Sequence, residues 1–261
     1  MELWKGKWAL VTGASAGIGQ ALAAQLAAGG AHLVLVARRL DRLERLAKEL
    51  RDKHGIRLEV LAADLARPGA PDEVFSFTSG KGIEVELLCN NAGFGAYGAF
   101  HKSELPRQLE MVQVNCAAVV HLTHLYLPPM IARGHGGILI LASTAAFQGV
   151  PYIATYAATK AFDLLFAEAL AEEVRRYGVR VCALCPGSTA TEFQQVAGQP
   201  DRMFSRAETA EKVARVGLEA IAAGKSSVIS GLGNFLGAES QRFVPRRMVT
   251  RIAAKMFEPS A

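Results

Sequence analysis

Short apolar runs alternate with longer segments of helical periodicity along most of the chain. The runs that predict buried strands lie at residues 8–11, 32–37, 58–62, 85–89, 138–141, 179–184 and 227–230. The segments with helical spacing lie at residues 18–28, from 41 onwards, 103–133, 155–177 and 207–223. Strands that alternate with helices are typical of right-handed βαβ units. The pattern predicts an α/β fold: a doubly wound, mostly parallel seven-stranded sheet flanked by helices.

The same pattern predicts how the chain is divided. No repeat, low-complexity linker or shift of composition marks a boundary, so we expect one domain over 1–261 with its core at about 6–230. Asp41 and Glu44 have the spacing of a capping box, which predicts the start of the second helix. The Pro128-Pro129 pair predicts a break near the end of the long helix at 103–133.

Composition narrows the class of protein. The 261 residues are 51% hydrophobic and 20% charged, which is typical of a globular protein with a substantial core. The net charge of +5 comes from 29 basic and 24 acidic residues, without the clustering that a nucleic-acid reader needs. The start of the chain, Met1 to Lys5, has no apolar signal core, and we expect a cytoplasmic protein without a nucleic-acid partner.

Cysteine and histidine spacing gives no strong sign of redox or metal chemistry. Cys182 and Cys185 match C-x-x-C, but they end an apolar strand-like run, whereas a redox motif begins a helix. His121 and His124 are the nearest histidines in the chain and have no carboxylate or cysteine partner at metal-ligand spacing. We therefore expect no metal.

A glycine-rich turn follows the first predicted strand. Gly13, Gly17 and Gly19, together with Ser15 and Ile18, form G-x-x-x-G-x-G where that strand passes into a helix. Glycines let the backbone approach a pyrophosphate, which the positive N-terminal end of the helix also attracts. The turn predicts dinucleotide binding in a Rossmann-type domain.

The end of the second predicted strand indicates which dinucleotide is bound. An acidic residue is expected there when the partner is the ribose of NAD, but the chain has Arg38-Arg39 and no carboxylate before Asp41. An arginine holds a 2′-phosphate through charge-assisted hydrogen bonds, whereas an acid repels it. We expect NADP(H), with Arg38 as the stronger candidate and Arg39 as the weaker one.

Tyr156 and Lys160 have the i,i+4 spacing that places both on one face of a helix. A tyrosine with an ordinary pKa of about 10 needs a downward shift of roughly three units, or about 4 kcal/mol, to exchange protons near neutrality. One positive charge about 4 Å away supplies that much at an effective dielectric near 20. Ser143 follows the fifth strand, where its hydroxyl is expected to hold a substrate oxygen.

With these motifs in this order, the sequence resembles the short-chain dehydrogenase/reductase family over about residues 6–230, in its single-domain, NADP(H)-preferring branch. The resemblance implies that Asn115, Ser143, Tyr156 and Lys160 are the catalytic tetrad, with Asn115 holding a water that links Lys160 to solvent. It implies further cofactor contacts beyond the glycine turn and the arginines, and we include Thr189 with them: Asp64, Asn91, Ala92, Gly93, Tyr156, Lys160, Pro186, Gly187, Thr189 and Thr191.

The segment 188–206 has few helix signals and follows Pro186-Gly187, which suggests a lid over the site. Several large apolar residues are candidates for a substrate pocket, or for ordinary core positions: Phe94, Phe147, Tyr152, Phe193, Met203 and Phe204. The expected reaction is hydride transfer between NADP(H) and an apolar carbonyl or alcohol. The alternatives are an NADP(H)-binding sensor or scaffold and an isomerase or epimerase that uses the cofactor transiently.

The tail at 234–261 departs from the family's commonest ending because it is basic and amphipathic. Met248, Ile252 and Met256 share one helical stripe. We expect the tail to pack on the body of the protein or on a partner subunit, and contact with an anionic membrane surface is the less favoured alternative. The family resemblance alone implies a homodimer or homotetramer joined through the long helices.

Overall fold

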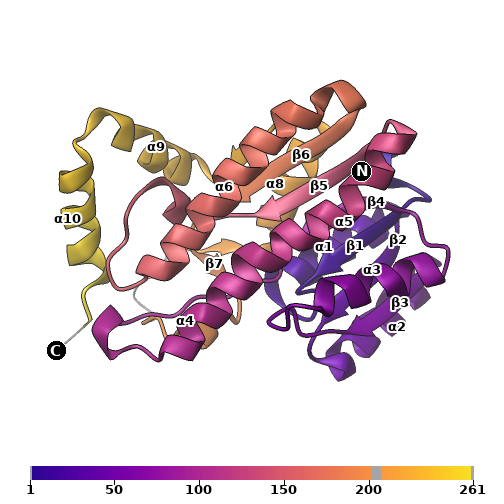
Figure 1. Ribbon diagram of the computed structural model, residues 1–261, viewed down its shortest axis with the longest axis horizontal. Helices are drawn as coiled ribbons and strands as arrows, with labels where there is room; N and C mark the ends of the chain where they lie inside the picture. Colours follow the sequence, from indigo (N-terminus) through magenta and orange to yellow (C-terminus); the bar gives the residue numbers. More distant parts are fainter. Residues whose placement is uncertain (1, 201–206, 260–261) are drawn as a thin grey trace.

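A seven-stranded sheet forms the centre of the protein (Figure 1). The computed structural model describes residues 2–200 and 207–259. The strands of the sheet are β1 (Trp8–Thr12), β2 (His32–Ala37), β3 (Leu58–Ala62), β4 (Val85–Asn90), β5 (Gly136–Leu141), β6 (Val179–Cys185) and β9 (Ser227–Ile229). Their order is β3-β2-β1-β4-β5-β6-β9, and every neighbouring pair is parallel. The predicted doubly wound α/β fold is confirmed.

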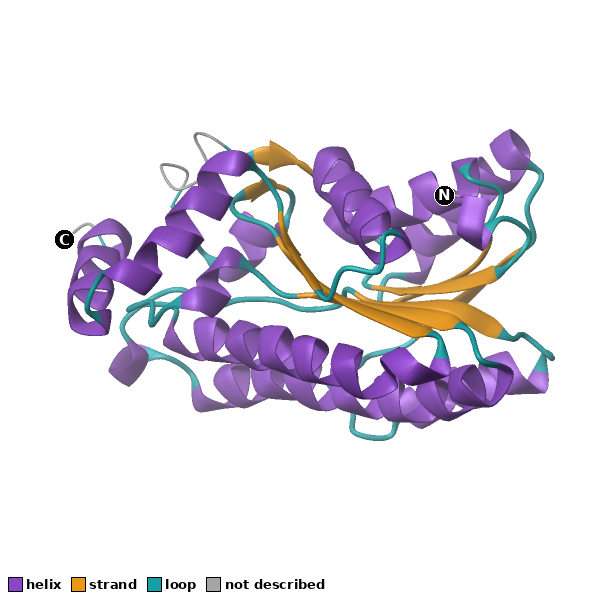
Figure 2. Cartoon of the chain, turned by 90° about the horizontal axis from the view of Figure 1, so that it is seen from above, coloured by secondary structure: helices purple, strands orange, loops and turns teal. Residues whose placement is uncertain are grey.

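Helices cover both faces of the sheet (Figure 2). One face packs against α1 (Gly17–Ala28), α2 (Leu40–His54) and α8 (Ala210–Ala222). The other packs against α3 (Ala70–Gly80), α4 (Leu105–Val112), α5 (Ala118–Arg133) and α6 (Ala154–Val174). Successive strand residues point to opposite faces, so Val11 and Leu33 join the first core and Leu10 and Val34 the second. Burial on both faces explains why the strands read as continuous apolar runs.

The strand order reverses between β1 and β4, and the functional crevice of such a sheet lies at this point, beyond the carboxyl ends of the strands. Hydrogen bonds fix the two strand ends to each other. The Thr12 hydroxyl donates to the Cys89 carbonyl (3.2 Å) and accepts from the amides of Asn91 and Ala92 (3.0 Å each). The Asn91 side-chain amide donates to the Thr12 carbonyl at 2.8 Å. The first turn of the fold is thereby held rigidly at the centre of the sheet.

Two helix boundaries differ from the sequence prediction. The expected capping box at Asp41 and Glu44 is wrong, because α2 already begins at Leu40. Its N-cap residue is Arg39, which makes no side-chain capping bond. The expected break at Pro128-Pro129 is also wrong, since α5 continues to Arg133. Both prolines are exposed, so water can satisfy the carbonyls that lose an amide partner. The real irregularity of the long helical segment is a π-helical turn at Gln113–Ala117.

Several elements were not predicted. Helix α3 is rich in Ser, Thr, Gly and Pro and has a weak helix signal in the sequence. A small second sheet pairs β7 (Thr189–Ala190) with β8 (Glu208–Thr209), and α7 (Phe193–Ala197) follows β7. The tail at 234–261, in contrast, was expected to be helical, and it forms α9 (Leu232–Ser240) and α10 (Arg246–Phe257). None of the described helices combines the length and apolar character needed to cross a bilayer.

Gly178, just before β6, provides a test of backbone packing. Its φ is +73°, and an added Cβ would collide with the carbonyl oxygen of Gly134 at the end of α5. We expect Gly178→Ala to lower the free energy of unfolding by about 3 kcal/mol, from backbone strain and overpacking together. Gly224→Ala is the control, because Gly224 has the same φ of +73° and an added Cβ there meets no described atom within 4 Å. Equal losses in urea denaturation would contradict the packing argument.

Candidate active site

One cavity of about 810 Å³ lies along the carboxyl ends of the strands, where the sheet order reverses. It brings the glycine turn, both arginines and the Tyr156–Lys160 pair together, although they come from distant parts of the sequence. The residues predicted to contact a cofactor all line it: Gly13, Ser15, Gly17, Ile18, Gly19, Arg38, Arg39, Asp64, Asn91, Ala92, Gly93, Tyr156, Lys160, Pro186, Gly187, Thr189 and Thr191. Their roles stay predictions, but their shared location is an observation.

The glycine turn at one end of the cavity has no room for side chains. Gly13 has a φ of +66°, and an added Cβ would lie 2.8 Å from the Asn91 Nδ2 atom and 2.9 Å from the Ala92 Cα atom. Gly17 has a φ of +56° and faces the Thr191 side chain at 3.0 Å. Helix α1 begins at Gly17 and has no acidic residue in its first turn, so its amide groups favour an anion. The turn therefore fits a pyrophosphate group.

An arginine cluster lies beside this turn. Arg39 donates from Nη2 to the Ser15 hydroxyl at 3.1 Å and from Nη1 to the Glu192 carboxylate at 2.8 Å. Arg42 donates to the other oxygen of Glu192 at 2.5 Å, and these two bonds hold the pKa of Glu192 below its usual value. Arg38 is more exposed and lies 3.7 Å from Glu110. Sequence analysis missed Glu192, because it is 150 residues or more from both arginine partners.

Asp64 lies at the same end of the cavity. One carboxylate oxygen accepts from the Ala66 amide at 3.1 Å, so part of its side chain shapes the local turn after β3.

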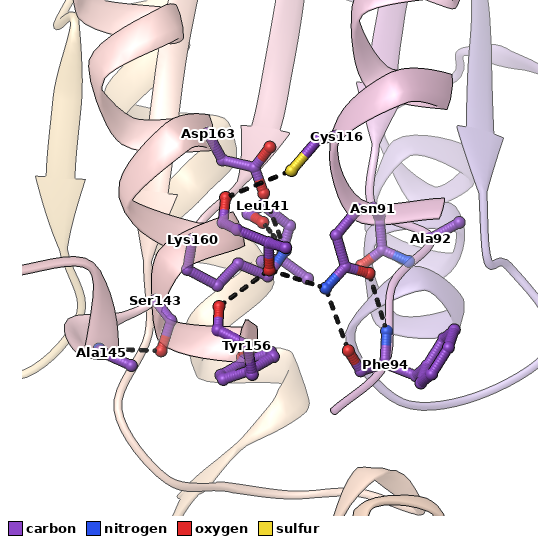
Figure 3. Close-up of polar contacts among 12 residues, drawn as sticks. Asn91, Ala92, Phe94, Cys116, Leu141, Ser143, Ala145, Tyr156, Lys160 and Asp163 are labelled. Atoms are coloured by element: carbon purple, nitrogen blue, oxygen red, sulfur yellow. Dashed lines mark hydrogen bonds and ion pairs between the residues drawn. The ribbon is translucent and has the colours of Figure 1, made fainter. Parts of the chain in front are cut away.

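At the other end of the cavity, Ser143, Tyr156 and Lys160 lie close together (Figure 3). Ser143 follows β5, and its hydroxyl accepts from the Ala145 amide at 3.1 Å. Tyr156 and Lys160 lie one turn apart on α6, with the Lys160 Nζ atom 6.0 Å from the centre of the Tyr156 ring. Lys160 donates to the Leu141 carbonyl at 2.6 Å and to the Asp163 carboxylate at 2.9 Å.

The protein alone does not give Tyr156 the low pKa that the sequence argument expected. Burial raises the pKa of the phenol above its ordinary value, and this effect exceeds the opposing effects of Lys160 and of a hydrogen bond with Ser143. Asp163 also raises the pKa of Tyr156, because its negative charge offsets that of the lysine. The positive charge of Lys160, on which the expected low pKa of Tyr156 rested, is thus outweighed by burial and opposed by this acid.

Asp163 is a site residue that sequence analysis missed. It is fully buried, and one of its carboxylate oxygens has no hydrogen-bond partner among the described residues. Lys160 is 4% exposed, and its pKa is raised because the charge of Asp163 acts against the effect of burial. The available signal was an acid three residues after the lysine, on the same helix face and among apolar neighbours. The two form a buried ion pair behind the tyrosine.

Asn115 lies behind the cavity wall and does not line the cavity. Its side-chain amide donates to the Phe94 carbonyl and to the Thr159 hydroxyl, both at 3.0 Å, and its oxygen accepts from the Phe94 amide at 3.1 Å. It belongs to the π-helical turn at Gln113–Ala117. Asn115 therefore holds the loop after β4 against α6. A water relay through it stays a prediction.

The substrate side of the cavity is only partly as expected. Phe94 and Phe193 line it, whereas Phe147 and Tyr152 do not. Met203 and Phe204, with the end of the predicted lid at 188–206, lie outside the described residues. Val150, Ile153, Val196, Met256 and Phe257 complete the apolar wall. The last two come from α10, which is attached by a 2.8 Å bond from the Tyr97 hydroxyl to the Phe257 carbonyl.

The C-x-x-C pair does not have the geometry of a redox or metal site. Cys182 packs in one core and Cys185 in the other, so their side chains point to opposite faces of the sheet. Burial raises the pKa of each thiol to about 12. Among the described residues, no group of three or more His, Cys, Asp or Glu side chains has a metal-binding arrangement.

Comparison with known proteins matches this arrangement to a family. The family model described as "short chain dehydrogenase" matches residues 7–202, which is about three quarters of the chain. The chain belongs to the short chain dehydrogenase family. The predicted family is confirmed.

Members of this family with different named substrates are similar to the chain. A very-long-chain 3-oxoacyl-CoA reductase from Phaeosphaeria nodorum is 38% identical over 181 residues, which cover 68% of this chain but only 53% of the relative. The 7beta-hydroxysteroid dehydrogenase of Collinsella aerofaciens is 32% identical over 186 residues, covering 71% of this chain and 70% of that protein. Among solved structures, a short-chain dehydrogenase from Sphingobium yanoikuyae in complex with NADPH has a TM-score of 0.84 and 29% identity. The match covers 93% of this chain and 95% of the Sphingobium chain.

The buried Lys160–Asp163 pair gives a stability prediction. We expect Asp163→Ala to lower the free energy of unfolding by about 3–5 kcal/mol, because it leaves the Lys160 ammonium buried without its counter-charge. Asp163→Asn is the matched control: it keeps the shape and one oxygen acceptor, so its loss should be smaller. Urea denaturation of both variants measures the difference. A loss below about 1 kcal/mol for Asp163→Ala, as for an exposed pair, would contradict the structural importance of the pair.

Proposed function

We propose that this protein is an NADP(H)-dependent oxidoreductase that interconverts a carbonyl and an alcohol. The observation that carries the proposal is the single cavity with a pyrophosphate-fitting glycine turn at one end and Tyr156 beside Lys160 at the other. A bound nicotinamide would supply or accept the hydride. The cofactor would be held by the glycine turn, by Asn91 to Gly93 and by Pro186 to Thr191.

The residues of the chain manage the proton and the substrate oxygen. Ser143 and Tyr156 hydrogen-bond the oxygen, and Tyr156 gives it a proton in reduction or takes the proton in oxidation. Lys160 stabilises the phenolate, since its positive charge lowers the pKa of Tyr156. Asp163 keeps the buried Lys160 charged. Its negative charge also raises the pKa of Tyr156 and so weakens the effect of Lys160 on the phenol. Asn115 positions the loop that faces them.

The preference for NADP(H) rests on the arginine cluster. Ser15, Arg38 and Arg39 line the cavity where β2 ends, and the Ser15–Arg39 pair presents a hydroxyl and a guanidinium to a 2′-phosphate. Glu192 binds the same guanidinium, so a phosphate would compete with this carboxylate. The similar Sphingobium enzyme is a complex with NADPH, which agrees with this proposal.

The proposed substrate is a bulky apolar ketone or its alcohol. Much of the cavity lining is apolar, which favours a hydrophobic substrate; it includes Phe94, Val150, Ile153, Val196 and Met256. Two of the relatives are named for large apolar substrates, as a very-long-chain 3-oxoacyl-CoA reductase and a 7beta-hydroxysteroid dehydrogenase. These names agree with the proposed substrate class.

We also propose a homodimer or homotetramer that assembles through α4 to α6. Leu109, Val112, Phe162 and Leu165 on these helices are all more than 40% exposed, and such a surface favours contact with a second copy. A cytoplasmic location is proposed because Cys89, Cys116, Cys182 and Cys185 are all free thiols, as is usual in a reducing compartment.

Tyr156→Phe tests the reaction. We expect kcat for an apolar ketone to fall by about 10²–10⁴-fold, because the variant has no proton to transfer, while NADPH affinity changes little. Turnover is measured as NADPH oxidation and affinity by fluorescence titration. Tyr177→Phe, in the exposed turn that follows α6, is the control and should keep its activity. Comparable turnover in the two variants would contradict the mechanism. A wild type that binds NADPH but reduces no carbonyl would favour the sensor alternative.

The arginines predict the cofactor preference. We expect Arg38→Ala and Arg39→Ala each to weaken NADPH binding by about 10–100-fold, since each removes a charged hydrogen-bond donor from the 2′-phosphate. NADH lacks this phosphate and serves as the internal control, so its affinity should change much less. Fluorescence titration with both cofactors gives the ratio. An equal loss for NADH and NADPH would show that the arginines act on the fold and not on the phosphate.

A further inference from the structure

We propose that the C-terminal tail, defined as residues 232–257, is a docking surface for a membrane of anionic phospholipids. The first observation is the concentration of exposed apolar side chains on this short segment. Its large hydrophobic residues with at least 46% exposure are Leu232, Phe235, Leu236, Phe243, Met248, Ile252 and Met256. Exposed apolar side chains that gather on one segment in this way mark an interaction site.

On α9 the apolar residues form one stripe. Leu232, Phe235 and Leu236 have i,i+3,i+4 spacing and are 74%, 46% and 59% exposed. Ala238 is the buried residue of this helix. Phe243, in the turn between α9 and α10, is 89% exposed, the highest value among the large hydrophobic residues that the structure describes. This part of the tail presents its apolar side to the outside.

On α10 an apolar stripe runs beside a basic one. Ala253 packs inward against Val150 and Ile153, which fixes the orientation of the helix. Met248, Ile252 and Met256 follow each other at i,i+4,i+8 on the exposed side. A basic residue directly precedes each of them in the sequence. These basic residues therefore form a second exposed stripe beside the apolar one: Arg247, Arg251 and Lys255. Such a pair of stripes is typical of a helix that lies in a membrane interface.

The charge of the tail complements an anionic surface. Residues 232–257 contain five basic side chains (Arg242, Arg246, Arg247, Arg251 and Lys255) and one acidic one (Glu239). With Glu258, which follows directly, residues 232–261 carry +3 of the chain's net +5. Arg242 pairs with Glu239. The other four basic residues form no ion pair within residues 2–200 and 207–259. Basic residues at a membrane surface attract phosphatidylserine or phosphatidylglycerol headgroups.

These features favour a membrane over the alternative occupants. A second copy related by a two-fold axis would bring the same patch of both subunits together. The basic stripe of one copy would then lie near the basic stripe of the other, and the like charges would repel each other. A nucleic acid would bind the arginines but leave the adjacent apolar stripe in water. A bilayer surface satisfies both stripes, because its headgroups are anionic and its interior is apolar.

The tail is also a wall of the substrate cavity. Met256 and Phe257 line the cavity, and Figure 1 shows α10 at one end of the molecule, away from α2 and α3. An apolar ketone dissolved in the bilayer therefore has a short path from the docking surface to Tyr156. This extension rests on the proposed function, whereas the docking surface itself does not.

Vesicle co-sedimentation of the full chain tests the proposal. The wild type should bind vesicles containing about one third phosphatidylglycerol much more strongly than pure phosphatidylcholine vesicles, and less strongly as salt rises from about 0.1 M to about 0.5 M. Arg247→Gln/Arg251→Gln/Lys255→Gln should weaken binding by about a hundredfold, at about fivefold per basic residue. Arg45→Gln/Lys48→Gln/Lys53→Gln on α2 removes the same charge elsewhere and should weaken it far less.

A second variant separates apolar insertion from simple charge attraction. Phe243→Ser should weaken vesicle binding by about tenfold or more, and circular dichroism and NADPH affinity should stay unchanged because Phe243 is exposed. Phe235→Ser should behave in the same way. The readout is binding and requires no turnover, so it is independent of the proposed reaction.

Three results would overturn the proposal. The first is wild-type protein that does not bind anionic vesicles better than neutral ones. The second is an equal loss of binding in the α2 control. The third is a Phe243→Ser variant that binds vesicles as the wild type does but changes its mass in light scattering, which would assign the surface to a second copy. If the triple variant does not fold, the lipid and salt dependence of the wild type together with Phe243→Ser decides the question.

Discussion

The buried ammonium of Lys160 is the constraint on which the rest of the active site depends. It lies between the carbonyl of Leu141 at the end of β5 and the carboxylate of Asp163 on α6, and both contacts are within 2.9 Å. A charge in such a place is stable only with partners of this quality. Because the contact with Leu141 joins β5 to the helix that carries Lys160, it also fixes α6, and with it Tyr156, at the edge of the sheet.

Two neighbouring parts of the cavity, the glycine turn and the arginine cluster beside it, are built by different physical means. At the glycine turn, close backbone approach and the Thr12–Asn91 hydrogen bonds leave a rigid cradle with exposed amide groups. At the arginine cluster, Ser15, Arg39, Arg42 and Glu192 form a polar network on a more exposed surface. The glycine turn has little freedom to adjust, whereas the arginine cluster can exchange one acidic partner for another. Cofactor preference is therefore expected to change more readily by substitution than cofactor binding itself.

Much of the architecture was predictable because it depends on local patterns. The seven strands of the main sheet read as apolar runs, and the cavity contains the cofactor residues that the motifs indicated. The failures have a common origin in tertiary contacts. Asp163 reads as a surface acid until α6 is packed, and Glu192 is 150 or more residues from its arginine partners. The prolines of α5 were expected to break the helix. Both lie on its exposed side, so the helix continues through them and its buried side still contributes Tyr126 and Met130 to the core. The wall supplied by α10 had no signal linking it to the site.

The π-helical turn at Gln113–Ala117 has a consequence for how this segment can vary. A π-helical turn contains one residue more than the α-helical turn that would otherwise occupy its place in the helix. Such turns often occur at functional sites. Removal of one residue here would replace the wide turn that carries Asn115 by a regular α-helical turn joining α4 to α5. Asn115 would then no longer face the Phe94 backbone. The contact between Asn115 and the loop after β4 therefore depends on the number of residues in this turn as well as on the amide side chain itself.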